Sequence, residues 1–147
     1  MTNEHLPRVA DLMRDIDLCM LVTRKGDAIA GRPMSNNGEV EYDGDSYFFT
    51  YASSGMVTDI GHDPTVALVF HRSPGLLSGG PVFLHLQGKA ELVSDRNAFA
   101  GRWHKSLDTW FEAGVDTPDL MMIRVHAHRA AFWDGAEAGD IILSEVG

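Results

Sequence analysis

Three residues in the first half of the chain have the chemistry to hold an anion. Arg32 carries a guanidinium group, which can donate paired hydrogen bonds to a phosphate or a carboxylate. Ser53 and Ser54 stand where a helix is predicted to begin, so their hydroxyl groups and the free backbone N–H groups there could meet the same anion. The alternative to anion binding is that Ser53 is only an N-cap and Arg32 a solvated strand residue. Taken by themselves, the residue types favour this alternative.

The seven histidines are the next candidates for chemistry. His126 and His128 are two apart on a predicted strand, so they point to one face. A pair without a third ligand nearby is more typical of a solvated face than of a zinc site, so we predict no metal ligands. His71, His85 and His104 are scattered, and no Ser-His-Asp or Cys-His arrangement can be argued. We therefore assign no catalytic residue.

The remaining candidates have simpler interpretations. Cys19, the one cysteine, lies in an apolar run and is best explained as a small buried residue. Asp116 and Asp119 flank Pro118 and are typical of a turn. Trp110 and Trp133 could cover an aromatic ligand or pack in the core.

Strands must position most of these residues. The hydrophobic spacing predicts a short amphipathic helix over residues 4–16, and turn residues separate the strands. A helix is predicted to begin at Ser53–Ser54 and to stop at Asp63-Pro64, and Asp95 is predicted to cap a helix over 96–107. Gly88 is a candidate for a bulge or bend. The predicted strands are 18–23, 28–34, 39–42, 46–50, 65–70, 82–93, 121–133 and 141–143.

The composition fits one domain spanning residues 1–147. Hydrophobic residues make up 44% of the chain, enough for a core, and short strands between tight turns favour a barrel. The net charge of −9 argues against nucleic acid as a partner. No segment is long and apolar enough to span a membrane and no secretory signal is evident, so we expect a cytoplasmic protein without a membrane partner.

Five motifs in this order resemble the pyridoxamine 5′-phosphate oxidase-like superfamily, and most closely its general stress protein 26 branch. Together they span about residues 10–135. The matching stretches are Arg32-Pro33-Met34, Phe48-Phe49-Thr50, the segment Ser53 to Pro64 followed by Val66-Ala67-Leu68-Val69-Phe70, the block of Trp103, Trp110-Phe111, Gly114 and Asp116 to Leu120, and Phe132-Trp133-Asp134-Gly135.

The resemblance implies a mainly β fold with short helices: a split β-barrel that forms a homodimer and holds FMN between its subunits. A tryptophan from the partner subunit completes the pocket in relatives. The cofactor-binding positions carried over are Arg32, Pro33, Met34, Phe49, Thr50, Ser54 and Trp133. Met56 stands where the branch usually has a basic residue, which leaves the phosphate one cation short and makes flavin retention an open question.

The function implied is that of a flavin-dependent oxidoreductase linked to stress, with NAD(P)H or another small molecule as electron donor. The alternatives are a flavin-binding or sensing module without turnover, and a split barrel that uses a deazaflavin, a haem or no cofactor. Biosynthetic pyridoxamine-phosphate oxidases carry an Arg-x-His motif after the tryptophan. Residues 136–147 contain neither arginine nor histidine, which argues against vitamin B6 phosphate as the substrate.

Overall fold

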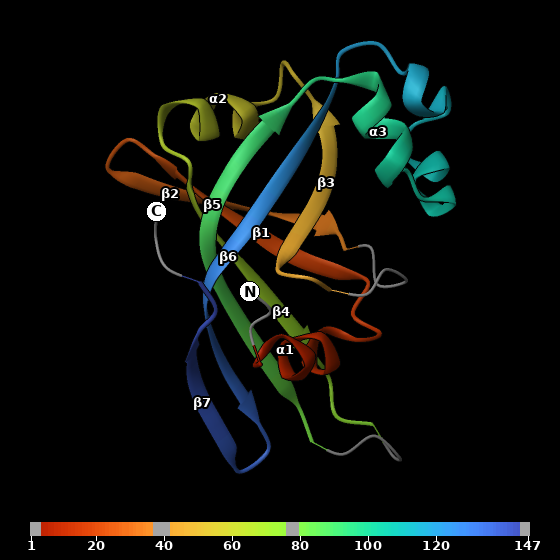
Figure 1. Ribbon diagram of the computed structural model, residues 1–147. Coiled ribbons are helices and arrows are strands. Elements are labelled where there is room, and N and C mark those ends of the chain that lie inside the picture. Colours follow the sequence, from red (N-terminus) through yellow and green to blue (C-terminus); the bar gives the residue numbers. More distant parts are fainter. Residues whose placement is uncertain (1–3, 37–41, 76–79, 145–147) are drawn as a thin grey trace.

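The computed structural model describes residues 4–36, 42–75 and 80–144. An antiparallel sheet dominates it, and helices lie at its ends (Figure 1). The strands are β1 (Leu18–Lys25), β2 (Ala28–Ser35), β3 (Asp45–Tyr51), β4 (Thr65–Arg72), β5 (Val82–Val93), β6 (Leu120–Asp134) and β7 (Glu137–Ile142). The helices are α1 (Leu6–Met13), α2 (Gly55–His62) and α3 (Arg96–Arg102), with the 3₁₀ turns η1 (Lys105–Thr109) and η2 (Gly114–Asp116).

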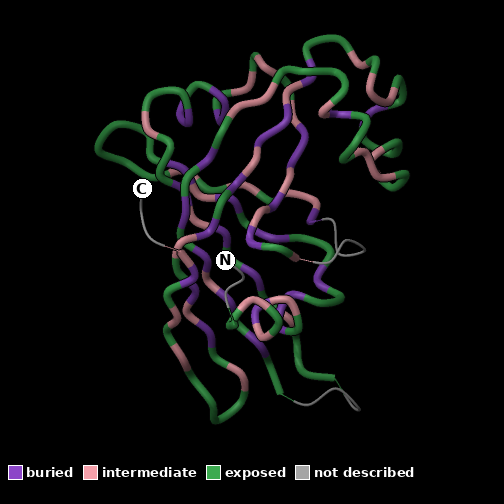
Figure 2. The backbone as a smooth tube through the Cα atoms, in the orientation of Figure 1, coloured by how far each residue is buried: buried purple, intermediate pink, exposed green. Residues whose placement is uncertain are grey.

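The strand order is β2-β1-β4-β5-β6-β3, with β7 paired to the far end of β6. The long strands β5 and β6 run through the whole molecule and carry smaller elements at both ends (Figure 1). The predicted mainly β class with short helices is therefore confirmed. The sheet encloses one main core, to which β1, β4, β5 and β6 as well as α1 and α2 contribute (Figure 2).

Alternation along the strands explains how the sheet gains an inner and an outer face. In β5, Val82, Leu84 and Leu86 are buried, whereas the intervening Phe83 and Gln87 are exposed. A period of two is what a pleated strand with one covered face requires. The exposed Phe83 is unusual, because an outward position on a solvated sheet is ordinarily polar.

The structure corrects three predicted boundaries. The helix predicted over 96–107 ends at Arg102, because Trp103 and His104 are extended and the His104 ring accepts the N–H of Ser106 to begin η1. The last strand begins at Glu137, where the sequence is polar, because it forms a hairpin with β6. The first helix is shorter than 4–16, and the strand predicted over 39–42 lies almost wholly outside the described residues.

Two local predictions are confirmed. Asp95 accepts the N–H of Asn97 and caps α3. The β5–β6 register shifts between Gln87 and Gly88, where a Cβ on Gly88 would lie 2.1 Å from the carbonyl oxygen of His126. Among the described residues, no helix is long and apolar enough to cross a membrane.

Candidate functional site

A cavity of about 410 Å³ lies between the open end of the β1–β2 hairpin, opposite its turn, strand β3 and the segment from α3 to η1. It contains three of the predicted cofactor-binding residues, Pro33 and Met34 from β2 and Phe49 from β3. The other lining residues are Leu18, Ser35, Tyr47, Phe48, Tyr51, Arg102, His104, Ser106, Leu107, Trp110 and Phe111. Its walls are mainly aromatic and aliphatic, with a few polar groups, which is the usual composition of a small-molecule site.

Aromatic contacts fix the outer wall of this cavity. The ring of Phe49 lies 5.9 Å from Phe99 and 4.8 Å from Trp103 in edge-on geometries, and Trp103 lies 5.8 Å from Phe111. Edge-to-face pairs at these distances stabilise a packing arrangement beyond the area they bury. This second cluster, separate from the main core, holds the irregular segment after α3 against β3.

A smaller cavity of about 240 Å³ adjoins the first. The two share Tyr47, Arg102 and His104. The smaller one also contains Asp43 and Asp45, so it differs in charge from the larger.

Arg32 lies on the opposite side of its strand from Pro33. It is paired with Leu21 and shares that residue's inward face, and its Nη1 donates to Thr23 Oγ1 at 2.9 Å. Its Nη2 lies 3.6 Å from Asp59 Oδ2, and the Thr23 hydroxyl donates to the same oxygen at 3.0 Å. Arg32 is therefore beneath α2 and does not line the cavity.

The predicted residues around α2 have local partners. Ser54, and not Ser53, is the N-cap of α2: its Oγ accepts the N–H of Val57. Ser53 instead donates both its N–H and its hydroxyl to Asp119 Oδ2. Thr50 is half-buried on β3 and is not among the residues that line the cavity.

Met56 does not face a ligand site. Its side chain is 6% exposed and belongs to the main core cluster. A lysine at position 56 would place its ammonium group among apolar side chains, which is energetically costly.

Trp133 lies on the outer face of the sheet, away from the cavity. It is 51% exposed and pairs with Phe83 of β5, whose ring neighbour is His71 at 4.7 Å. Strand β6 is three strands from β1 in the sheet, and Trp133 is not among the residues that line the cavity. Within one chain, the structure does not bring Trp133 together with Pro33, Met34 and Phe49.

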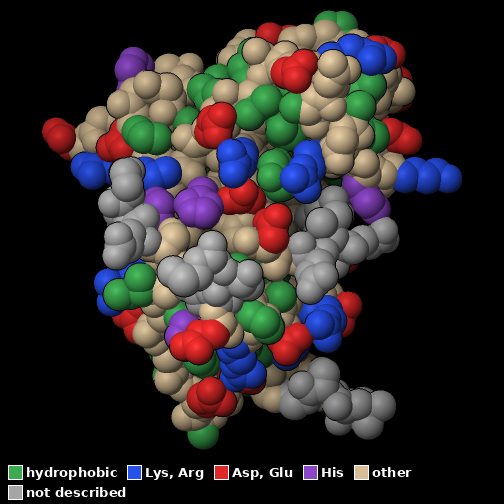
Figure 3. All heavy atoms as spheres, viewed as in Figure 1, with side chains coloured by type: hydrophobic (Ala, Val, Ile, Leu, Met, Phe, Trp, Pro, Cys, Tyr) green, Lys and Arg blue, Asp and Glu red, His purple; other side chains and the backbone are tan. Residues whose placement is uncertain are grey.

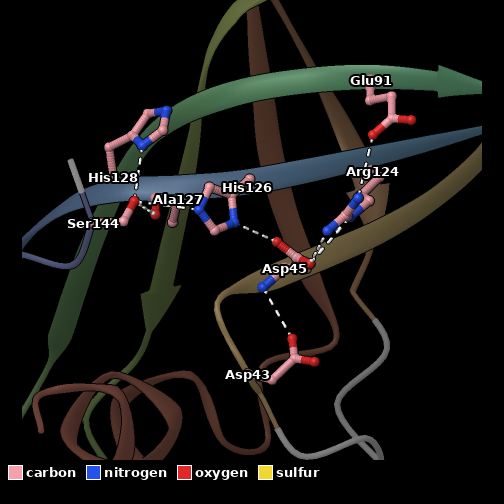
Figure 4. Close-up of polar contacts among 8 residues, drawn as sticks. All are labelled: Asp43, Asp45, Glu91, Arg124, His126, Ala127, His128 and Ser144. Atoms are coloured by element: carbon pink, nitrogen blue, oxygen red, sulfur yellow. Dashed lines mark hydrogen bonds and ion pairs between the residues drawn. The ribbon is translucent and has the colours of Figure 1, made fainter. Parts of the chain in front are cut away.

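A polar network on β3 and β6 was not predicted from the sequence (Figure 4). Asp45 Oδ2 accepts two hydrogen bonds from Arg124, and Asp45 Oδ1 lies 2.6 Å from His126 Nδ1. His126 Nε2 lies 3.3 Å from Ser144 Oγ, which is 2.9 Å from His128 Nδ1. The antiparallel register pairs Asp45 directly with His126, although 81 positions separate them.

The order Asp45, His126, Ser144 is that of a hydrolytic triad, but its contacts are those of a structural network. Ser144 Oγ also lies 3.2 Å from the carbonyl oxygen of Ala127, so several acceptors compete for its one proton. The bonds from His126 and Arg124 outweigh desolvation and lower the pKa of Asp45. The network links β3, through Asp45, and the segment after β7, through Ser144, to strand β6. No group of three or more potential metal ligands was found among the described residues.

Arg102 and His104 are two of the cavity residues that the sequence analysis did not assign to the site. The helix predicted over 96–107 gave no reason to turn them toward β2 and β3. The break at Trp103 does so, and Asp108, which accepts the Trp103 indole N–H at 2.9 Å, helps to fix that break. For Trp110 the sequence leaves open a contact with an aromatic ligand or a place in the core, and Phe111 follows it in the same motif. The structure places Trp110 at the cavity rim and buries Phe111 in its wall.

The mainly β architecture and the solved structures similar to it define a split-barrel protein. The chain matches the family model described as pyridoxamine 5′-phosphate oxidase like over residues 4–144, and it belongs to that family. The resemblance inferred from its motifs is thereby confirmed. Comparison with the curated proteins gave no match.

Three solved structures illustrate the shared fold. A Clostridium acetobutylicum protein related to general stress protein 26 is 16% identical, with 95% of each chain covered and a TM-score of 0.76. General stress protein 26 from Bacillus anthracis is 18% identical, with 95% of this chain and 99% of that chain covered and a TM-score of 0.74. A NimC/NimA family protein from Clostridium acetobutylicum is 16% identical, with 95% and 96% covered and a TM-score of 0.67.

Proposed function

We propose that the chain binds FMN and that the bound flavin makes it an oxidoreductase. The observation that carries this proposal is the aromatic cavity that brings Pro33 and Met34 of one motif together with Phe49 of another. These residues come from two different strands, β2 and β3, which are not paired with each other in the sheet. A flavin ring is flat, apolar on its faces and polar at its edge, and such a cavity suits it.

The phosphate would be held on the β2–α2 side. Apart from the Val57 N–H, which Ser54 caps, the first turn of α2 has backbone N–H groups without helical acceptors, which favour an anion. Arg32 supplies the cation, although Asp59 shares it. Because Asp59 already neutralises part of the Arg32 charge, we expect FMN affinity below that of a site whose cation is unshared.

The flavin, when bound, supplies hydride or electron transfer. The chain's residues bind and shield it. Phe49 is fixed by its aromatic neighbours, Leu107 and Phe111 form an apolar wall that excludes water, and Pro33 restricts the backbone at the cavity edge. No residue is assigned as a catalytic acid or base.

The site is proposed to be completed by a second copy of the chain. The outer face of β1, β4, β5 and β6 exposes apolar side chains where solvent-facing residues would be polar: Leu18, Met20, Val69, Phe83 and Trp133. Leu18 also lines the cavity, so this face and the cavity are continuous. A homodimer through this face would cover the apolar residues and would let Trp133 of the second copy approach a site that the chain's own Trp133 cannot reach.

A flavin-binding module without turnover is the second candidate, and the sharing of Arg32 with Asp59 favours it, because a weakly held flavin suits sensing. NAD(P)H added to the flavin-loaded protein separates the two functions. Bleaching of the flavin absorbance identifies a reductase, and unchanged absorbance under anaerobic conditions identifies a module.

The binding test is an FMN titration followed by fluorescence. Arg32→Ala should weaken FMN binding by about tenfold or more through the lost charge-assisted contact. Asp59→Asn should tighten it severalfold, because the amide still accepts the Thr23 hydrogen bond but no longer competes for the guanidinium. Arg24→Ala, which removes an exposed cation from the same hairpin, is the matched control.

Because Arg32 also holds β1 and α2 together, each variant is first checked by thermal unfolding. A folded wild-type protein that shows no FMN binding at high micromolar concentration would overturn the proposal. Equal affinities for wild type and Arg32→Ala would remove Arg32 from the phosphate site.

A further inference from the structure

Arg102 differs from most arginines of the described chain in its partners. Seven arginines form ion pairs with carboxylates: Arg8, Arg14, Arg24, Arg32, Arg96, Arg124 and Arg129. Arg102 has no such pair with any described residue. Its guanidinium carbon instead lies 4.1 Å from the centroid of the Tyr47 ring. The protein has a net charge of −9, so a cation left without a carboxylate at a cavity is a distinctive feature.

The contact between the guanidinium carbon of Arg102 and the Tyr47 ring does not use the N–H groups of Arg102. A guanidinium group is planar and its five N–H bonds lie in that plane, so contact of its face with an aromatic ring does not consume them. The ring of Tyr47 orients the group while its edge can still pair with a carboxylate in a two-bond arrangement. A lysine could not keep both contacts, since its ammonium group is a point charge.

The rest of the cavity specifies what is attached to that carboxylate. No aspartate or glutamate is present among the described residues that line the larger cavity, and Asp43 and Asp45 line only the smaller cavity that adjoins it at Arg102. Phe49, Tyr51 and Trp110 supply aromatic surface, and Tyr51 and Trp110 remain exposed at the rim. A flat apolar ring would gain burial and stacking against these side chains.

We propose that the part of this cavity around Arg102 recognises aromatic carboxylates, with Arg102 pairing with the carboxylate and the ring contacting Tyr51 and Trp110. That an aromatic carboxylate is the compound that meets a bound flavin rests on the proposed function. The binding of the carboxylate itself does not require FMN. Aromatic amines, neutral aromatic amides and aliphatic cations are then poor ligands.

The test compares 2-naphthoate with 2-naphthamide, which have nearly the same shape and differ in charge. Calorimetric titration of the flavin-free protein should show 2-naphthoate binding about tenfold more tightly or better, the effect of one charge-assisted pair. Arg102→Gln should reduce that preference to about one, and Arg102→Lys should retain part of it. Arg96→Gln is the matched control, because Arg96 is on the same helix but pairs with Asp116 outside the cavity.

Equal binding of the two probes by the wild-type protein would overturn the inference, as would an unchanged preference in Arg102→Gln. An FMN titration of the same samples keeps the two proposals apart. A protein that prefers 2-naphthoate but fails to bind FMN contradicts only the proposed function. One that binds FMN without distinguishing the probes contradicts only the role of Arg102.

Discussion

Arg32 and Arg102 show how a side chain's partners decide what it can do. Arg32 is in a recognisable motif, yet its Nη1 already donates to Thr23 and to the carbonyl oxygens of Leu21 and Ala30, and its Nη2 forms an ion pair with Asp59. Arg102 belongs to no motif but lines the cavity beside an aromatic ring. A buried or half-buried charge is stabilised only when it is paired, so an existing carboxylate partner lowers the gain from a new anion. The two arginines are therefore expected to respond differently to the same anionic ligand.

Met56→Lys is expected to destabilise the fold without tightening FMN binding. The position is in the main core, and a buried lysine either keeps its charge at a high desolvation cost or loses its proton. We expect a loss of roughly 3–5 kcal/mol in the free energy of unfolding at pH 7. Urea titration measures the loss, and Met56→Leu, which preserves volume, should cost less than about 1.5 kcal/mol. A stable Met56→Lys protein with higher FMN affinity would show that α2 packs differently.

His128 is expected to make the protein less stable in mild acid. Desolvation, followed by the charges of His126 and Lys89, lowers the pKa of His128 below its ordinary value of 6.5. The unfolded chain then binds the proton more readily than the folded chain, so stability is lost as the pH falls below about 6.5 and until the folded group is protonated too.

The measurement is the urea midpoint at pH 7.5 and at pH 5.5. Wild type should lose more stability between these values than His128→Asn, whose side-chain amide can still reach Ser144 as the Nδ1 atom does. His62→Asn, which removes a histidine from the exposed end of α2, should keep the wild-type dependence on pH. An identical loss in wild type and His128→Asn would show that other groups cause it.

At the scale of elements, local patterns located most strands but not the junctions between them. Strand β5 has the predicted bounds because alternation and flanking turn residues are local signals. The break between α3 and η1 depends on contacts of Trp103 with Asp108 and with Phe49, and Phe49 lies on β3, outside any short window of sequence around Trp103. The pairing of Asp45 with His126 likewise depends on the β3–β6 register. The candidate site lies at these junctions, so the motifs identified its β-strand residues but not Arg102 or His104.

Gly88 is expected to be essential for the pairing of the two longest strands. A methyl group there would overlap the backbone carbonyl of His126, so alanine must displace β5 from β6 at the bulge. We expect Gly88→Ala to cost at least about 2 kcal/mol. The control is Gly61→Ala on the exposed side of α2, where a Cβ meets nothing within 4 Å. It should stabilise the protein by about 0.5–1 kcal/mol. Chemical denaturation of both variants tests the contrast, and equal effects would contradict it.

At the scale of the whole molecule, charge and apolar surface are distributed differently. On the face drawn in Figure 3, acidic and basic side chains are interspersed, without a broad region of one sign. The exposed apolar residues instead gather on the outer face of the central strands, where Phe83 and Trp133 are adjacent. Contiguous exposed apolar side chains in a soluble domain are typical of an interface, and the cavity opens next to this one.

Phe83→Glu is therefore expected to convert a homodimer into a monomer. Phe83 is 45% exposed in the single chain, so a charge there should leave the barrel folded but would be buried against a second copy. Light scattering coupled to size-exclusion chromatography should give twice the 16.1 kDa chain mass for wild type and one chain mass for the variant. Thr58→Glu, on the exposed side of α2, should remain dimeric. The monomeric variant should also lose FMN affinity, since the second copy's Trp133 is then absent. A monomeric wild-type protein would contradict a site shared between subunits, and so would an undiminished FMN affinity in the monomeric variant.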